Sequence, residues 1–209
     1  MRSPPQCHYA RVIFAAVLLI TMVVSGFGPA RSAEYKGGYP YRAGATVGMV
    51  ADIVRAVAGD RAEVTGIIGA GIDPHIYNPT RGDVAVLLKS DIIFYAGLLL
   101  EGQMTDILVK VSRRKPVYAV TELLQTGYLI HDDQTRHHDP HVWMDVQGWM
   151  KAVEVVASAL QAFDPNHAGE YRDNAGRYQG ELKRLDDYAR RVIGSIPSGR
   201  RILVTAHDA

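Results

Sequence analysis

Short apolar runs alternate along this chain with stretches in which apolar residues recur at helical spacing. The runs predict five strands, at residues 45–50, 62–68, 91–96, 116–120 and 201–206, the first of them buried. The stretches between them predict helices at residues 52–58, 80–89, 102–111, 146–163 and 165–193. Strands that are apolar throughout and alternate with helices are typical of a parallel sheet covered on both faces. The pattern therefore predicts an α/β fold.

Local signals fix several helix ends. Thr80 and Asp83 have the spacing of a capping box, and Asp145 is placed to cap the helix at 146–163. Asp164 and Pro165 end that helix and open the next one. The helix at 165–193 carries many charges and only a sparse apolar seam, so we expect it to connect two lobes and to be exposed over much of its surface.

The N-terminal region has the pattern of a secretory signal peptide. A basic start with Arg2 and Arg11 precedes a dense apolar run of 13 residues, Val12–Val24, and small residues follow. A membrane-spanning helix needs about 20 apolar residues, so an uncleaved anchor is the weaker alternative. We expect residues 1–33 to be the signal peptide and residues 34–44 to be a loose leader. The position of Cys7, before the apolar run, argues against a lipoprotein.

Composition narrows the function classes. The 209 residues are 47% hydrophobic and 22% charged, which is typical of a globular protein, and the net charge is +1. Such a balance gives no support for nucleic-acid binding. The single cysteine excludes an internal disulfide framework and a multi-cysteine zinc site. The eight histidines are the residues whose placement points to a specific function.

Two of these histidines occur in the same tripeptide, Asp-Pro-His, at residues 73–75 and 139–141. Proline restricts its own backbone and that of the preceding residue, so His75 and His141 should be presented on stiff loops. Asp73 and Asp139 are placed to orient the imidazoles. A third histidine, His207, directly follows a predicted strand. Imidazole binds zinc and other first-row metals, so these three histidines are candidate metal ligands.

Four segments together resemble one family. They are GAGIDPHIYNPTRGDV (69–84), YAGLLLEGQM (95–104), DPHVWMD (139–145) and LVTAHDA (203–209). Their order and content are similar to those of the TroA-like solute-binding proteins of bacterial zinc and manganese ABC importers. The resemblance implies a two-lobe solute-binding fold, with a parallel sheet in each lobe and a long rigid helix between them. It implies a metal-binding N-terminal lobe at 34–164, the inter-lobe helix at 165–196, and the start of a truncated C-terminal lobe at 197–209.

The same resemblance implies the ligands and the partners. His75, His141 and His207 would bind Zn²⁺ or Mn²⁺, with Asp73 and Asp139 behind them, and a fourth, acidic ligand would lie in the part of the C-terminal lobe absent from this chain. Histidine rather than glutamate at position 207 favours zinc. We expect an exported, monomeric metal receptor, not an enzyme, that delivers the ion to the membrane subunits of an ABC permease.

Two other functions remain open at this stage. Three histidines with an open coordination position would also suit a zinc-dependent hydrolase, although the chain lacks a His-Glu-x-x-His string. A surface adhesin is the second alternative. Among the remaining candidates, His131, His137 and His138 fit solvated loop residues or weak metal ligands, and Glu101 fits a structural role. Trp143 and Trp149 fit core residues, with shielding of the site from water as the alternative.

Overall fold

The computed structural model describes residues 34–121, 124, 127–131 and 137–204. Its centre is a parallel sheet in the order β2-β1-β3-β4. The strands are β1 (Tyr41–Ala45), β2 (Ala62–Gly66), β3 (Ile92–Tyr95) and β4 (Val117–Ala119). The α/β class predicted from the alternating pattern is confirmed, and β3 has the continuous burial expected of a central strand, since Ile92, Ile93 and Phe94 are fully inaccessible.

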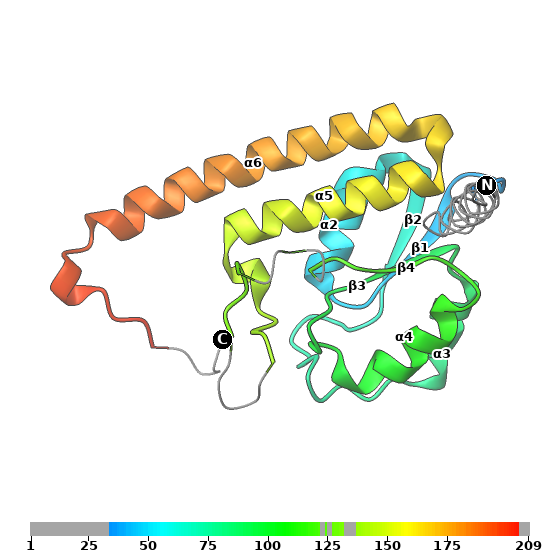
Figure 1. The fold of residues 1–209 in the computed structure, drawn as a ribbon, viewed down its shortest axis with the longest axis horizontal. Helices are drawn as coiled ribbons and strands as arrows, with labels where there is room; N and C mark the ends of the chain where they lie inside the picture. Colours follow the sequence, from blue (N-terminus) through cyan, green and yellow to red (C-terminus); the bar gives the residue numbers. More distant parts are fainter. Residues whose placement is uncertain (1–33, 122–123, 125–126, 132–136, 205–209) are drawn as a thin grey trace, which may run out of the picture. The chain divides into compact units, whose positions relative to one another are not determined.

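Helices cover both faces of this sheet. They are α2 (Gly48–Ala58), α3 (Arg81–Lys89), α4 (Thr105–Ser112), α5 (Val146–Phe163) and α6 (Ala168–Ser195). Single 3-10 turns lie at Gly59–Arg61, Gly102–Met104, Val142–Met144, Pro165–His167 and Ser198–Arg200. Figure 1 shows α2, α5 and α6 gathered on one side of the sheet and α3 and α4 on the other. No helix within the described residues is both long enough and apolar enough to cross a bilayer.

The capping hydrogen bonds predicted for two helices are present in the structure. Thr80 and Asp83 form a complete capping box at the start of α3. The Asp145 side chain accepts the backbone N–H groups of Gln147 and Gly148, so α5 begins at Val146 as predicted. These caps satisfy backbone donors that would otherwise lack partners at a helix N-terminus. They also place the segment before α5, which contains His141, at a defined position.

The first strand was predicted at the wrong residues. Residues 45–50 were expected to form a strand after a loose leader at 34–44, but β1 spans Tyr41–Ala45 and Gly48 already opens α2. Tyr41 explains the difference, because its ring is completely buried against Phe163 and starts the strand earlier. The apolar residues at 47–50 read equally well as strand or helix, and packing selects the helix.

The two ends of α6 differ in burial. Tyr171, Ala175 and Leu182 pack on the rest of the protein, whereas Leu185, Tyr188 and Val192 are exposed. The predicted apolar seam is therefore buried only along its first half. At 28 residues the helix is about 42 Å long, and Figure 1 shows its second half extending past α5. A strand was predicted at 201–206, but residues 201–204 have no regular structure and 205–206 lie outside the described residues.

Candidate metal centre

His75 and His141 lie in loops that follow strands of the sheet. His75 belongs to the connection between β2 and α3, and His141 lies between β4 and α5, just before the 3-10 turn Val142–Met144. In a parallel α/β sheet, the loops at the carboxyl ends of the strands are where ligands bind. The chain thus brings both histidines to the edge of the sheet at which chemistry is expected.

Both Asp-Pro-His tripeptides build the same local turn. Asp73 Oδ1 accepts the backbone N–H of His75 at 2.9 Å, and Asp139 Oδ1 accepts the backbone N–H of His141 at 2.9 Å. In each turn the proline lies between the two bonded residues and fixes the backbone in the required conformation. The repeated tripeptide is therefore a repeated structure, in which each aspartate fixes the direction of the following histidine.

The two imidazoles meet although they are far apart in sequence. The Nε2 atoms of His75 and His141 are 3.2 Å apart, and the ring centroids are 5.2 Å apart with the planes inclined at 60°. Two ring nitrogens facing each other at this distance can share a proton or hold a common electrophile. The sequence analysis predicted that these two histidines would converge, and the structure brings them together.

The orientation of His141 is fixed from its other side. Its Nδ1 lies 2.7 Å from Asp139 Oδ1, and its side chain is only 9% exposed. A carboxylate at Nδ1 favours the tautomer in which Nδ1 carries the proton, so the Nε2 lone pair points toward His75. Trp143 adds a second constraint, because its ring packs edge-on against His141 with centroids 5.1 Å apart. Trp143 is half-buried and packs against the core, as expected, and it also contacts the candidate site.

The third candidate ligand, His207, lies outside the described residues. Within the described part of the chain, no group of three or more histidine, cysteine, aspartate or glutamate side chains is arranged to hold a metal ion. Among the other loop histidines, His131 and His138 pair across a single antiparallel bridge, with perpendicular rings 5.5 Å apart. The described site is thus a pair of histidines backed by two aspartates.

Glu101 organises the same edge of the sheet from within. Its buried carboxylate accepts hydrogen bonds from the Thr46 hydroxyl and from the backbone N–H groups of Ala96 and Gly97. Burial raises the pKa of Glu101, although these three donors act in the opposite direction. The bonds link the ends of β1 and β3, and the structural role expected for Glu101 is confirmed.

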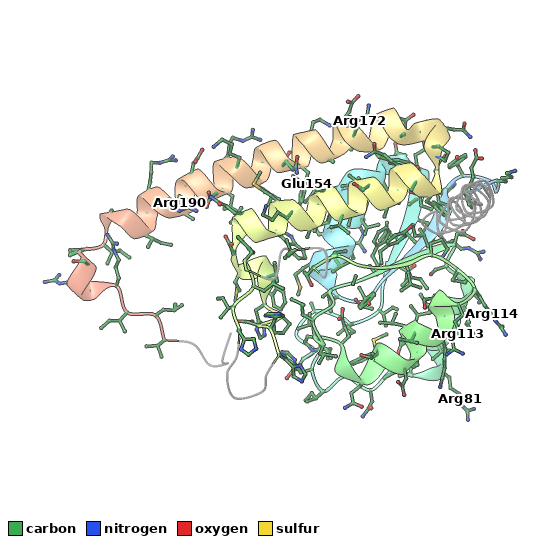
Figure 2. The ribbon with its side chains drawn as sticks, viewed as in Figure 1. Arg81, Arg113, Arg114, Glu154, Arg172 and Arg190 are labelled. Carbon is green, nitrogen blue, oxygen red and sulfur yellow. The ribbon has the colours of Figure 1, made fainter. Side chains whose placement is uncertain are left out.

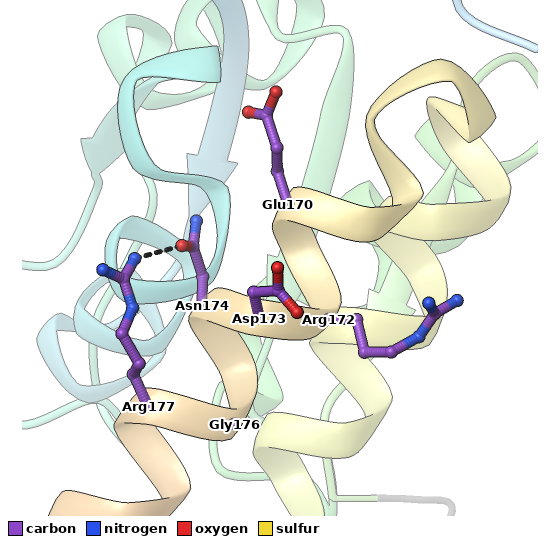
Figure 3. A pocket seen from close by; sticks show the side chains of 6 residues that line it. All are labelled: Glu170, Arg172, Asp173, Asn174, Gly176 and Arg177. Carbon is purple, nitrogen blue, oxygen red and sulfur yellow. Dashed lines mark hydrogen bonds between the residues drawn. The ribbon is translucent and has the colours of Figure 1, made fainter.

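Two of the hollows on the described surface lie beside His141 and on α6. One of about 270 Å³ adjoins His141 and is lined mainly by apolar side chains: Tyr128, Leu129, Ile130, Val142 and Met144, with Asp139 and Asp145 at its edge. The other lies on the first turns of α6 and is drawn in Figure 3, where Arg177 donates to Asn174. Glu170, which also lines it, pairs with Arg61 at 2.6 Å. These local pairings engage two of the charged residues that line the second hollow, Glu170 and Arg177.

Fold and site define the class of this protein: it is an α/β lobe of the kind found in solute-binding proteins, with two histidines at the ligand-binding edge of its sheet. The chain belongs to the family of the periplasmic zinc-uptake complex component A, whose model matches residues 44–209. The resemblance inferred from the four sequence segments is thereby confirmed.

Individual relatives agree with this assignment. The manganese-binding lipoprotein MntA of Bacillus subtilis is 36% identical over 197 residues, covering 94% of this chain and 64% of MntA. The zinc-binding protein TroA of Treponema pallidum is 39% identical over 164 residues, covering 78% of this chain and 53% of TroA. The structure of TroA matches with a TM-score of 0.78 at 38% identity, over 81% of this chain and 61% of that structure. The chain therefore spans less than two thirds of the length of these relatives.

Proposed function

We propose that this chain is the metal-capturing part of an extracytoplasmic receptor that binds a divalent transition metal and delivers it to an ABC importer. The observation that carries the proposal is the 3.2 Å separation of His75 Nε2 and His141 Nε2. Family membership supports it, and the relatives named above are described as binding manganese or zinc. Capture and release change only the coordination of the ion, so this function requires no catalytic base.

The spacing of the two nitrogens suits a tetrahedral ion. With Zn–N bonds of about 2.0–2.1 Å, two nitrogens of a tetrahedral zinc site lie about 3.3 Å apart. The His75–His141 separation is close to that value, so the pair needs little rearrangement to bind zinc. We infer that Asp139 holds His141 in the binding tautomer and that Asp73 fixes the backbone that presents His75.

We infer that His207 is the third ligand and that a fourth, acidic ligand comes from a C-terminal lobe beginning near residue 197. Under this division, residues 34–164 form the metal-binding lobe and residues 165–196 form the helix that connects the lobes. Three nitrogen donors favour zinc over manganese, because manganese prefers oxygen ligands. We therefore propose zinc as the preferred cargo and manganese as the alternative.

Export and partners follow from the same proposal. A signal peptide at residues 1–33 would direct the protein outside the cytoplasm, where several relatives are described as periplasmic or as lipoproteins. The partner is then a membrane permease that accepts the ion, and a single copy of the receptor suffices to hold it.

Isothermal titration calorimetry of the full chain with Zn²⁺ tests the proposal. The variants His75→Ala and His141→Ala should each weaken zinc binding at least 100-fold, because each removes a direct ligand. His167→Gln is the matched control, since it removes an imidazole that pairs with Asp164 at the junction of α5 and α6, away from the site. Unchanged zinc affinity in the double variant His75→Ala/His141→Ala would refute the proposal.

A further inference from the structure

A cluster of cations lies at the end of α3 and α4. We call it the basic patch and define it by Lys89, Lys110, Arg113, Arg114 and Lys115. Four of these residues, all but Lys89, line a surface hollow of about 310 Å³, together with Leu88 and Val111. Lys89 follows Leu88 in the last turn of α3. Figure 2 labels Arg113 and Arg114, which project outward from the end of α4.

The basic patch lies at the edge of the sheet opposite to the histidine pair. Lys115 precedes β4 by two positions, and its ammonium donates to the carbonyl oxygens of Leu88 and Ser90, just before β3. These residues therefore lie where the strands begin, whereas His75 follows the end of β2. A ligand of the basic patch would leave the histidine pair accessible.

Structural roles account for only part of this charge. Lys115 donates hydrogen bonds to carbonyl oxygens at the C-terminal end of α3, and burial lowers the pKa of its ammonium group. Nearby Arg42 is neutralised by Asp91, with 3.7 Å between the charged groups. Within the described residues, the side chains of Lys89, Lys110, Arg113 and Arg114 make neither hydrogen bonds nor ion pairs. Cations at helix ends interact favourably with the helix dipole, but two helix ends do not require four unpaired cations.

The centre of the basic patch is apolar. Leu88 is 57% exposed and lines the same hollow as Lys110, Arg113 and Arg114. An exposed leucine surrounded by cations combines the two features by which proteins bind at an anionic membrane surface: apolar contact at the interface and attraction to the headgroups. A single small anion would use the cations but gain nothing from the exposed leucine.

We propose that the basic patch docks this chain on anionic phospholipid headgroups. The proposal rests on the exported location inferred above, which places the protein beside a membrane. Several relatives are named lipoproteins, whereas the single cysteine of this chain, Cys7, precedes its apolar run. Electrostatic adsorption would keep the receptor near the membrane with its histidine pair facing the surrounding solution. Delivery to a permease would then require release from the lipid.

Co-sedimentation of the full chain with phosphatidylcholine vesicles, with and without phosphatidylglycerol, tests the proposal. The measured quantity is the ratio of the two affinities, because the apolar N-terminal run contributes to both. The variant Lys110→Gln/Arg113→Gln/Arg114→Gln should lower binding to anionic vesicles about 100-fold, since each cation near an anionic surface contributes about 1 kcal/mol, or about fivefold. Binding to neutral vesicles should not change.

The matched control is Arg172→Gln/Arg184→Gln/Arg191→Gln, which removes the same charge from exposed positions of α6 and should keep the wild-type ratio. Equal losses in the two triple variants, or no loss in the first, would overturn the proposal. Inorganic phosphate and sodium chloride at equal ionic strength should displace the protein from anionic vesicles equally. Stronger displacement by phosphate would identify a small-anion site instead and overturn the proposal too.

Two further measurements keep the outcome unambiguous. Thermal unfolding checks that the variants fold. If the triple variant does not fold, Arg113→Gln/Arg114→Gln replaces it, and we expect this double variant to bind anionic vesicles about 25-fold more weakly than the wild type. Zinc affinity should be unchanged in every patch variant. Lipid binding can therefore fail while the metal-receptor proposal stands, and the reverse also holds.

Discussion

Asp139 is the residue at which the proposed function can be tested most sharply. One of its oxygens accepts both the backbone N–H of His141, at 2.9 Å, and the Nδ1–H of the same residue, at 2.7 Å. The first bond fixes the loop and the second fixes the ring. Replacing Asp139 by alanine removes both while leaving the imidazole in place, so any loss of affinity reports orientation and tautomer rather than the ligand itself.

The expected magnitude follows from these two bonds. Both bonds orient the proposed ligand, and removal of a group that hydrogen-bonds a metal-ligating histidine typically lowers metal affinity about 10- to 100-fold, so we expect a decrease of that size in zinc affinity for Asp139→Ala. Asp139→Asn should fall between the wild type and Asp139→Ala, because its amide oxygen can accept both bonds but carries no charge. Calorimetry with Zn²⁺ measures all three affinities.

Asp73→Ala is the natural comparison for Asp139→Ala. The Asp73 carboxylate accepts the backbone N–H of His75 in the same turn, so its removal should weaken zinc binding less than the removal of Asp139. A loss below threefold in Asp139→Ala, or an equal loss in both alanine variants, would refute the reasoning that the Nδ1 contact sets the affinity.

Three further predictions concern stability and metal choice. Burial raises the pKa of Glu101 in the folded protein above its unfolded value. The contribution of Glu101 to the free energy of unfolding is therefore most favourable below the unfolded pKa and is lost as the pH rises through the folded pKa. Urea unfolding from pH 4 to 7 should show this loss in the wild type and not in Glu101→Gln. Leu182→Ala should lower the free energy of unfolding by about 2–4 kcal/mol and Leu185→Ala by less than about 0.5 kcal/mol, because only Leu182 is buried; equal urea midpoints would contradict this. His207→Glu should shift the ratio of zinc to manganese affinity toward manganese, and an unchanged ratio in competition titrations would argue against His207 as a ligand.

The elements that could be predicted from sequence are those with local causes. The capping box at Thr80 and the N-cap at Asp145 use side chains within three residues of the bonds they make, so they are visible in the sequence. The start of β1 depends instead on Tyr41 packing against Phe163, a contact between residues 122 positions apart. No local pattern contains that information, and the strand was predicted too late in the chain.

The same distinction applies to the site. The repeated Asp-Pro-His tripeptide pointed to His75 and His141, because a stiff loop with an adjacent aspartate is a local feature. For Trp143 the sequence favoured a core role over shielding of the site, since its contact with His141 depends on the 3-10 turn between that histidine and α5. An aromatic residue two positions after a candidate ligand was the available signal. Glu101 was assigned a structural role, but its link to Thr46 spans 55 residues and could not be predicted.

The arrangement of the pair also bears on how two separate loops could hold one ion, as the proposed function requires. An aspartate in the same loop fixes the backbone of each histidine, and Asp139 and Trp143 also restrain the ring of His141, so this ring would lose little rotational freedom if it bound a metal. Ligands that are already oriented avoid the entropic cost of ordering, which is about 0.5–1.5 kcal/mol for each side chain. The loops themselves rest on an edge braced by Glu101 from β1 to β3. Rigidity of the histidine pair therefore originates in buried hydrogen bonds beneath the loops as much as in the contacts of the histidines themselves.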